Sequence, residues 1–136
     1  MSKLYLIIGI PGAGKSTLAN KIIAEHPNTT IKHYEADMYF IRNGEYNFNP
    51  KKLFYAHKWC QVKAELAMID NYDVIISNTS LTPSERKPYI ELAKKYNYDI
   101  DVITCNGNYN NIHNVPIETI ERMKNKFIPY SQEELN

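Results

Sequence analysis

The chain has 136 residues, 43% of them hydrophobic and 23% charged, and a formal net charge of +1. This length provides for one hydrophobic core, so we expect residues 1–136 to form a single domain. The charge balance argues against a surface that attracts nucleic acid everywhere, and the sequence has neither a long apolar run nor a signal-peptide cleavage site, which predicts a cytoplasmic protein without a membrane span. Cys60 and Cys105 lack metal-binding spacing and are expected to be free thiols.

The chain begins with a strand, a helix and a second strand. Residues 3–10, "KLYLIIGI", form a continuous apolar run bounded by glycine, which is typical of a parallel strand buried on both faces. The helix that follows has apolar residues at Leu18 and Ile22 and ends within residues 25–28. A second strand is expected over residues 30–36, "TIKHYEA".

Turn and capping residues mark where the next elements begin. Asn43-Gly44 suits a tight turn. Asn49 and Pro50 suit the cap and first turn of a long helix. The predicted stripe of that helix consists of Leu53, His57, Cys60, Ala64 and Met68.

The second half of the chain repeats the alternation of strand and helix. Residues 72–77, "YDVIIS", predict a third strand, and Thr82 and Glu85 fit a capping box that opens a helix to about residue 96. The remaining expected elements are a strand over 99–105, a polar loop over 106–116, and an amphipathic helix from Pro116 that carries Ile117, Ile120, Met123 and Phe127. This order predicts an α/β fold in which a parallel sheet is covered by helices on both faces.

Residues 9–16, "GIPGAGKS", match the phosphate-loop pattern G-x-x-x-x-G-K-[ST], between a predicted strand and a predicted helix. Glycines let successive backbone N–H groups face phosphate oxygens, and the helix N-terminus adds positive potential. Lys15 is expected to reach the β- and γ-phosphates of ATP or another triphosphate and to act in catalysis, and Ser16 to hold Mg²⁺ through its hydroxyl. The predicted nucleotide-binding residues are Gly9, Pro11, Gly12, Ala13, Gly14, Lys15, Ser16 and Thr17.

Asp37 follows the second predicted strand. The carboxyl ends of strands in an open α/β sheet are where ligands bind, so Asp37 is a candidate to face the phosphate loop. A carboxylate there can accept the proton of an acceptor hydroxyl. The alternative is that Asp37 caps a short helix at residues 38–42.

The third predicted strand also ends in polar residues. Asn78 and Thr79 can bind the sugar or phosphate of an acceptor, or they can simply turn the chain toward Thr82. Ser77 occupies the position where many P-loop enzymes place an acid that supports Mg²⁺, so this support is missing from the strand.

The long helix carries lysines among aromatic residues, and such a face can hold a nucleic-acid strand by charge and stacking. The alternative is a solvated face with a buried imidazole at His57. His113 lies alone in the polar loop and predicts no metal site. The lysines and aromatic residues of the possible nucleic-acid-binding face are Lys51, Lys52, Tyr55, Lys58, Trp59 and Lys63.

Taken together, these segments resemble P-loop kinases of the polynucleotide 5′-hydroxyl kinase type. The resemblance is to a branch with compact, nucleoside-kinase-like domains that carries ADDFF-, AHxWC- and NIHGVP-like segments. Here these segments read "ADMYF" at 36–40, "AHKWC" at 56–60 and "NIHNVP" at 111–116, and the match extends from Lys3 to about Phe127.

The resemblance implies roles for particular residues. Asp37 matches the general base of the family, Lys15 and Ser16 match its nucleotide and magnesium contacts, and Asn78-Thr79 match its acceptor-side strand end.

The chain departs from the family in its lid. The family generally has arginines just before the NIHGVP-like segment, whereas residues 105–116 contain no arginine or lysine, which predicts a reduced lid. Arginine occurs only at Arg42, Arg86 and Arg122. The candidates to supply the missing charge are Arg122, Lys124 and Lys126 of the last helix, or a partner subunit in a homo-oligomer. In addition, Met38 replaces a second acid, and Phe40 replaces an arginine found in some relatives.

Two functions of different kinds remain open. The first is phosphoryl transfer from ATP to a hydroxyl, at a polynucleotide 5′ end or on a nucleoside-like small molecule. The second is nucleotide binding without transfer, in a sensor, sponge or assembly partner, which the reduced lid favours.

Overall fold

The computed structural model describes residues 2–107 and 115–136. Most of the expected polar loop and of the "NIHNVP" segment, with His113, therefore lies outside the described residues. The elements are β1 (Lys3–Ile8), α1 (Lys15–Glu25), β2 (Ile31–Tyr34), the 3₁₀ helix η1 (Ala36–Phe40), β3 (Ile41–Arg42), β4 (Glu45–Tyr46), η2 (Pro50–Lys52), α2 (Leu53–Ile69), β5 (Asp73–Ile76), α3 (Pro83–Lys95), β6 (Asp99–Thr104), α4 (Ile117–Lys126) and η3 (Gln132–Leu135).

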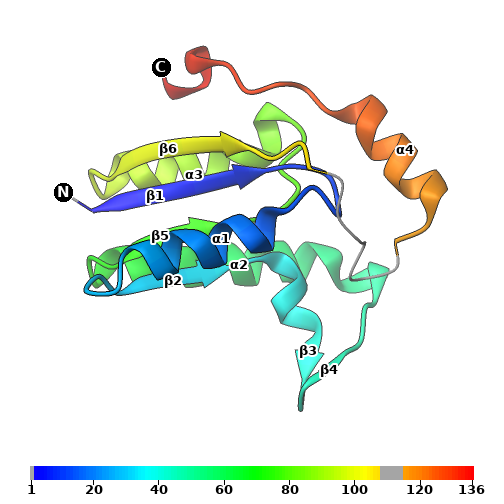
Figure 1. The fold of residues 1–136 in the computed structure, drawn as a ribbon, viewed down its shortest axis with the longest axis horizontal. Helices are drawn as coiled ribbons and strands as arrows, with labels where there is room; N and C mark the ends of the chain where they lie inside the picture. The colour runs from blue at the N-terminus through cyan, green and yellow to red at the C-terminus, as the bar shows by residue number, and fades with distance from the viewer. Residues whose placement is uncertain (1, 108–114) are drawn as a thin grey trace.

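The core is a parallel sheet with the strand order β2-β5-β1-β6 (Figure 1). β1 is its most buried strand and pairs with β5 and β6 on either side, which explains why its sequence is apolar without alternation. In this part of the fold, the sequence prediction of a parallel α/β sheet is confirmed.

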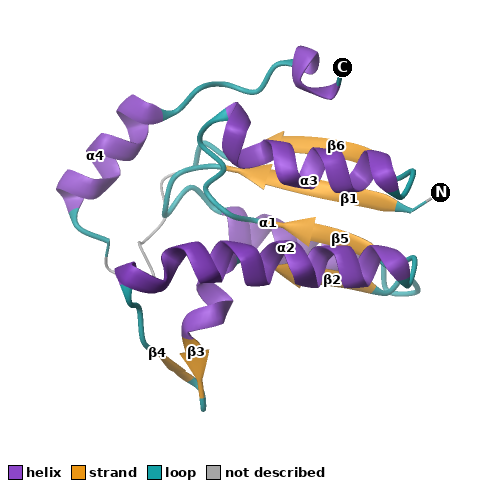
Figure 2. Cartoon of the chain, turned by 180° about the vertical axis from the view of Figure 1, so that it is seen from behind, coloured by secondary structure: helices purple, strands orange, loops and turns teal. Residues whose placement is uncertain are grey.

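Helices cover both faces of this sheet, as predicted. Tyr5, Ile7 and Ile75 pack with α1 on one face. Alternate residues of the same strands, such as Leu6 and Ile76, pack on the opposite face. There α2 and α3 lie over the sheet (Figure 2). The buried stripe of α2 consists of Ala56, Cys60, Ala64, Ala67 and Met68. The predicted stripe was therefore right at residues 60, 64 and 68, but Leu53 and His57 lie outside it, and Ala56 and Ala67 belong to it.

Local signals for element boundaries are confirmed. Thr82 and Glu85 form a complete capping box at the start of α3. The Asn49 side chain accepts a hydrogen bond from the Lys51 amide, 3.0 Å away, at the start of η2. Asn43 and Gly44 both have positive φ, of 53° and 79°, and join β3 to β4 in a hairpin that extends from the domain (Figure 1).

α4 covers neither face of the sheet. It lies beyond the carboxyl ends of the strands, and the residues after it run back past β6 and α3 (Figures 1 and 2). Ile120 and Phe127 are half-buried, whereas Ile117 is 74% exposed. Within the described residues, both cysteines are free, and no helix combines the length and apolar character needed to cross a membrane.

Candidate active site

The phosphate loop connects β1 to α1 at the carboxyl edge of the sheet. Gly12 and Gly14 have φ values of 82° and 98°, in the left-handed region that favours glycine. Gly9 is needed for a different reason, because a Cβ atom there would lie 2.9 Å from the carbonyl oxygen of Cys105. The backbone geometry therefore requires glycine at Gly9 and Gly14, the two glycines that the motif specifies, and also at Gly12, which the motif leaves open.

The N-terminus of α1 points its first amides into this loop. Gly14 is the cap residue and provides no side chain to accept from those amides. Uncapped amides at a helix N-terminus form a site for an anion, and the helix dipole strengthens it. Ser16 is partly buried and Thr17 is exposed in this first turn.

The Lys15 side chain lies close to two carboxylates. Burial lowers its pKa, while the negative charges of Glu35, Cys105 and Asp37 act in the opposite direction. Its Nζ donates to the carbonyl oxygen of Ile10 at 3.0 Å. The charges of Lys15 and Asp37 therefore interact at one edge of the sheet.

Asp37 lies in the first turn of η1, directly after β2. The cap residue of η1 is Glu35, so Asp37 is not the residue that caps this helix. The hydroxyl of Tyr46, on the hairpin, donates to Asp37 Oδ1 at 3.2 Å. Burial and the charge of Asp37 raise the pKa of Tyr46 to about 12, so the phenol stays neutral and can donate at physiological pH.

A second carboxylate, Glu35, was not predicted as a site residue. It lies at the end of β2, and the Ser77 hydroxyl donates to its Oε2 at 2.9 Å. His33 Nε2 is 2.6 Å from Ser77 Oγ, and burial lowers the pKa of His33. The alternation of β2 places residues 33 and 35 on one face, and this was the only sequence signal that could have linked the two.

Asn78 and Thr79 are held in contacts within the protein. Asn78 is buried, and its Oδ1 accepts from the amide of Ala36 at 2.7 Å while its Nδ2 donates to the Tyr89 hydroxyl at 3.3 Å. The carbonyl oxygen of Thr79 accepts from the amide of Gly9 at 3.1 Å. These contacts favour the alternative in which the two residues shape the turn, and an acceptor contact by Thr79 stays a prediction.

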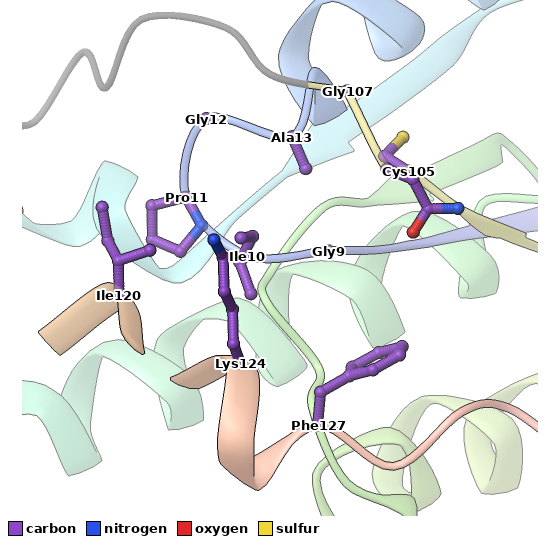
Figure 3. A pocket seen from close by; sticks show the side chains of 11 residues that line it. Gly9, Ile10, Pro11, Gly12, Ala13, Cys105, Gly107, Ile120, Lys124 and Phe127 are labelled. Carbon is purple, nitrogen blue, oxygen red and sulfur yellow. The ribbon is translucent and has the colours of Figure 1, made fainter. Parts of the chain in front are cut away.

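A pocket of about 470 Å³ opens between the phosphate loop and α4 (Figure 3). Ile120 and Lys124 of α4 and Phe127, the residue after it, line the pocket together with residues 9–13 and 105–107. In Figure 3 the Lys124 side chain extends from α4 toward Pro11 of the loop.

The other candidate cations have different surroundings. Lys126 Nζ lies 3.1 Å from Glu85 Oε1, and Arg122 contacts Thr119 at 3.4 Å on its own helix. Arg86 is fully buried and donates to backbone carbonyl groups and to Glu134. Lys124 is thus the predicted charge donor of α4 that lines the pocket with the phosphate loop.

The aromatic residues of α2 and the hairpin differ in exposure. Trp59 packs edge-on against Tyr34 at 6.2 Å between ring centroids, which favours a structural role. Tyr46 and Phe48, by contrast, are stacked at 6.4 Å with 11° between their planes, and Phe48 is 50% exposed. Neither residue of this stacked pair was predicted as a site residue.

Curated proteins from different organisms resemble this chain in sequence. NEDD4-binding protein 2 from Homo sapiens is 40% identical over 98 residues, which are 71% of this chain and 5% of that protein. The uridine kinase of Ureaplasma urealyticum serovar 10 is 34% identical over 113 residues, which are 78% of this chain and 53% of the enzyme. The chain therefore spans about half the length of the uridine kinase and a small part of the human protein.

Solved structures share the fold at low sequence identity. A chain of the Pnkp1/Rnl/Hen1 complex matches with a TM-score of 0.61 and 20% identity, covering 89% of this chain and 38% of that chain. The APS kinase CysC of Mycobacterium tuberculosis matches with a TM-score of 0.62 and 14% identity, covering 92% and 96%. The family model AAA_33, described as an AAA domain, matches residues 4–112.

Proposed function

The chain belongs to the AAA_33 family and has a P-loop kinase fold, and from this premise we propose that it transfers the terminal phosphoryl group of ATP to the 5′-hydroxyl of a polynucleotide. The observation that carries the proposal is that the phosphate loop follows β1 and Asp37 follows β2, so both lie at the carboxyl edge of the same parallel sheet. A triphosphate held by the loop and a carboxylate at the same sheet edge are two of the parts that transfer to an alcohol requires, and positive charge near the transferred group is the third.

Each residue has a distinct part in this proposal. The loop amides and Lys15 hold the phosphates, and Asp37 accepts the proton of the acceptor hydroxyl as the new P–O bond forms and the bond between the γ-phosphorus and the bridging oxygen breaks, which releases ADP. Lys124 supplies positive charge near the transferred group. A partner subunit in a homo-oligomer is the second possible source of that charge.

The available side chains fit a magnesium ion. Ser16 offers a hydroxyl in the first turn of α1, and Glu35 offers a carboxylate near Lys15. Mg²⁺ prefers such oxygen ligands and usually completes its shell with phosphate and water. Bound there, Mg²⁺ would neutralise charge on the phosphates. Among the described residues, no group of three or more His, Cys, Asp or Glu side chains could hold a metal by itself, so the nucleotide would have to contribute ligands.

The stacked pair of Tyr46 and Phe48 supports an acceptor that carries a base. Tyr46 also donates to Asp37, the proposed general base. The exposed ring of Phe48 is therefore separated from that carboxylate by the side chain of Tyr46. Aromatic rings bind nucleobases by stacking without strong sequence preference. A polynucleotide end would place a base on the rings and its 5′-hydroxyl at Asp37.

The test is incubation of the protein with γ-labelled ATP and a panel of acceptors. The panel contains 5′-hydroxyl DNA and RNA oligonucleotides, uridine and other nucleosides. We expect label on the oligonucleotides, none with Lys15→Ala, and a rate lowered about 10²- to 10⁴-fold by Asp37→Asn, with ATP affinity retained. Unchanged turnover in Asp37→Asn would remove Asp37 as the base.

The second candidate is a protein that binds nucleotide without transferring its phosphate. It is favoured by the commitment of Arg86 to buried structural contacts, which leaves that arginine unable to clamp phosphates. Saturable ATP binding without labelled product on any acceptor would support it. Label on nucleosides alone would instead identify a small-molecule kinase, the activity named for the Ureaplasma relative.

A further inference from the structure

Ser77 stands where an acid is common in P-loop proteins, and its hydroxyl contacts an acid on the neighbouring strand. P-loop NTPases commonly hold Mg²⁺ with the phosphate-loop hydroxyl and an acid on a neighbouring strand, and here Ser77 occupies the position of that acid after β5. β2 pairs with β5 in a register that sets Tyr34 opposite Ile76. The next residues along, Glu35 and Ser77, therefore lie side by side, and the Ser77 hydroxyl donates to Glu35 Oε2 at 2.9 Å.

This carboxylate lies on the face of the sheet that α1 covers. Ile75, two residues before Ser77, packs with α1, whereas Val74 and Ile76 belong to the opposite face. The start of α1 carries Lys15 and Ser16, the residues predicted to bind phosphate and magnesium.

Neighbouring side chains hold Glu35 in place. Because the Ser77 proton is directed to Glu35, the ring N–H at His33 Nε2 donates to Ser77 Oγ, at 2.6 Å. The Glu35 side chain is only 19% exposed. Within the described part of the chain, the hydrogen bond from Ser77 and the 4.0 Å contact with His33 Nε2 both use Oε2, so Oε1 can accept from a metal-bound water.

We propose that Glu35 takes over the part of the acid that β5 lacks and positions the Mg²⁺ of the bound nucleotide from β2, with Ser77 and His33 orienting its carboxylate. The proposal rests on the nucleotide-binding half of the proposed function and does not require an acceptor. It assigns Glu35 to metal positioning and leaves proton transfer to Asp37.

Calorimetric titration with ATP, in EDTA and over a series of Mg²⁺ concentrations, tests this role without a transfer step. For Glu35→Gln we expect the Mg²⁺ concentration at half-maximal effect to rise roughly 10- to 100-fold. Affinity for metal-free ATP should stay the same or increase, because a negative charge has been removed near the phosphates. Loss of affinity in both conditions would indicate a merely structural role and would overturn the proposal.

A charge-swapped variant provides the strictest test. Glu35→Ser combined with Ser77→Asp moves the carboxylate to the neighbouring strand, and we expect it to recover most of the magnesium dependence that Glu35→Ser alone loses. Glu91→Gln, at an exposed acid of α3, is the matched control and should behave as wild type. The proposal is wrong if Glu35→Gln leaves the Mg²⁺ dependence of ATP affinity unchanged. It is also wrong if the ATP affinity of the wild-type protein does not depend on the Mg²⁺ concentration. Failure of phosphoryl transfer alone would overturn only the proposed function.

Discussion

In the proposed reaction, Lys124 takes the place of the arginines that the reduced lid lacks. It lines the pocket with the phosphate loop, and its ion pair with Glu121, at 3.7 Å between largely exposed side chains, is too weak to hold it on its own helix. A lysine is a point charge without the planar fork of arginine, so it stabilises a transferring phosphoryl group less well. In the proposed reaction, this single residue would therefore limit the rate of transfer.

We predict that Lys124→Ala lowers kcat by about 10- to 10³-fold, below or at the lower limit of the range for arginine fingers. Lys126→Ala is the matched control, because Lys126 contacts Glu85 at 3.1 Å and does not line the pocket. Steady-state transfer of labelled phosphate by the two variants measures the difference. Equal effects at both positions would mean that α4 contributes only general positive charge.

Sequence reasoning at this scale succeeded where the relevant contact is local. The capping box of Thr82 and Glu85 spans one helical turn, and both partners are visible in the sequence. Glu35 was missed because its partner, Ser77, is 42 residues away and is brought close only by the pairing of β2 with β5. The burial of Arg86 was missed for the same reason, since Glu134 lies 48 residues further on.

The β3–β4 hairpin is the element that most directly concerns the acceptor. Its rings rest on the buried ring of Phe40, which Phe48 meets edge-on at 5.1 Å between centroids. Tyr46 links it to Asp37. Because Phe40 is buried and Phe48 is exposed, the hairpin is fixed to the domain and still offers a ring to solvent. A nucleobase can stack on Phe48 while its sugar reaches Asp37.

We predict that Phe48→Ser raises the KM for a 5′-hydroxyl oligonucleotide by about 5- to 150-fold, which corresponds to the roughly 1–3 kcal/mol of one stacked base. The KM for ATP should change little. Leu66→Ser, at a similarly exposed position of α2, controls for loss of surface apolar area. If Phe48→Ser affects both substrates alike, the hairpin supports the fold and not the acceptor.

The elements themselves were largely predictable, but the place of α4 was not. Apolar periodicity identified a helix from Pro116, and the structure begins it at Ile117. Periodicity says which side of a helix is apolar and not which surface covers it. Here the half-buried residues Ile120 and Phe127 line the pocket at the phosphate loop instead of covering the sheet, so the apolar side of this helix joins the candidate site together with Lys124, one of its predicted charge donors.

At the scale of the whole molecule, the residues after α4 tie the candidate site to the domain. The buried guanidinium of Arg86 donates to the carbonyl oxygens of Ser80 and Leu81, to that of Ile128, and to Glu134 Oε2 at 2.9 Å. The amide of Ile128 donates to Leu81 at 2.7 Å. The C-terminal residues thereby fix the end of α4, and with it Lys124, relative to the phosphate loop.

We predict that Glu134→Gln lowers the free energy of unfolding by about 3 kcal/mol, because it leaves the Arg86 charge buried without its carboxylate partner. Glu91→Gln, which breaks an exposed pair with Lys87 at 3.8 Å on the same α3, should cost less than about 1 kcal/mol. Urea denaturation at low and high salt measures both, and the loss in Glu134→Gln should persist at high salt because buried charges are screened little. If the loss of unfolding free energy disappears at high salt, the pair between Arg86 and Glu134 is exposed to solvent. It would then not fix the position of α4 beside the phosphate loop.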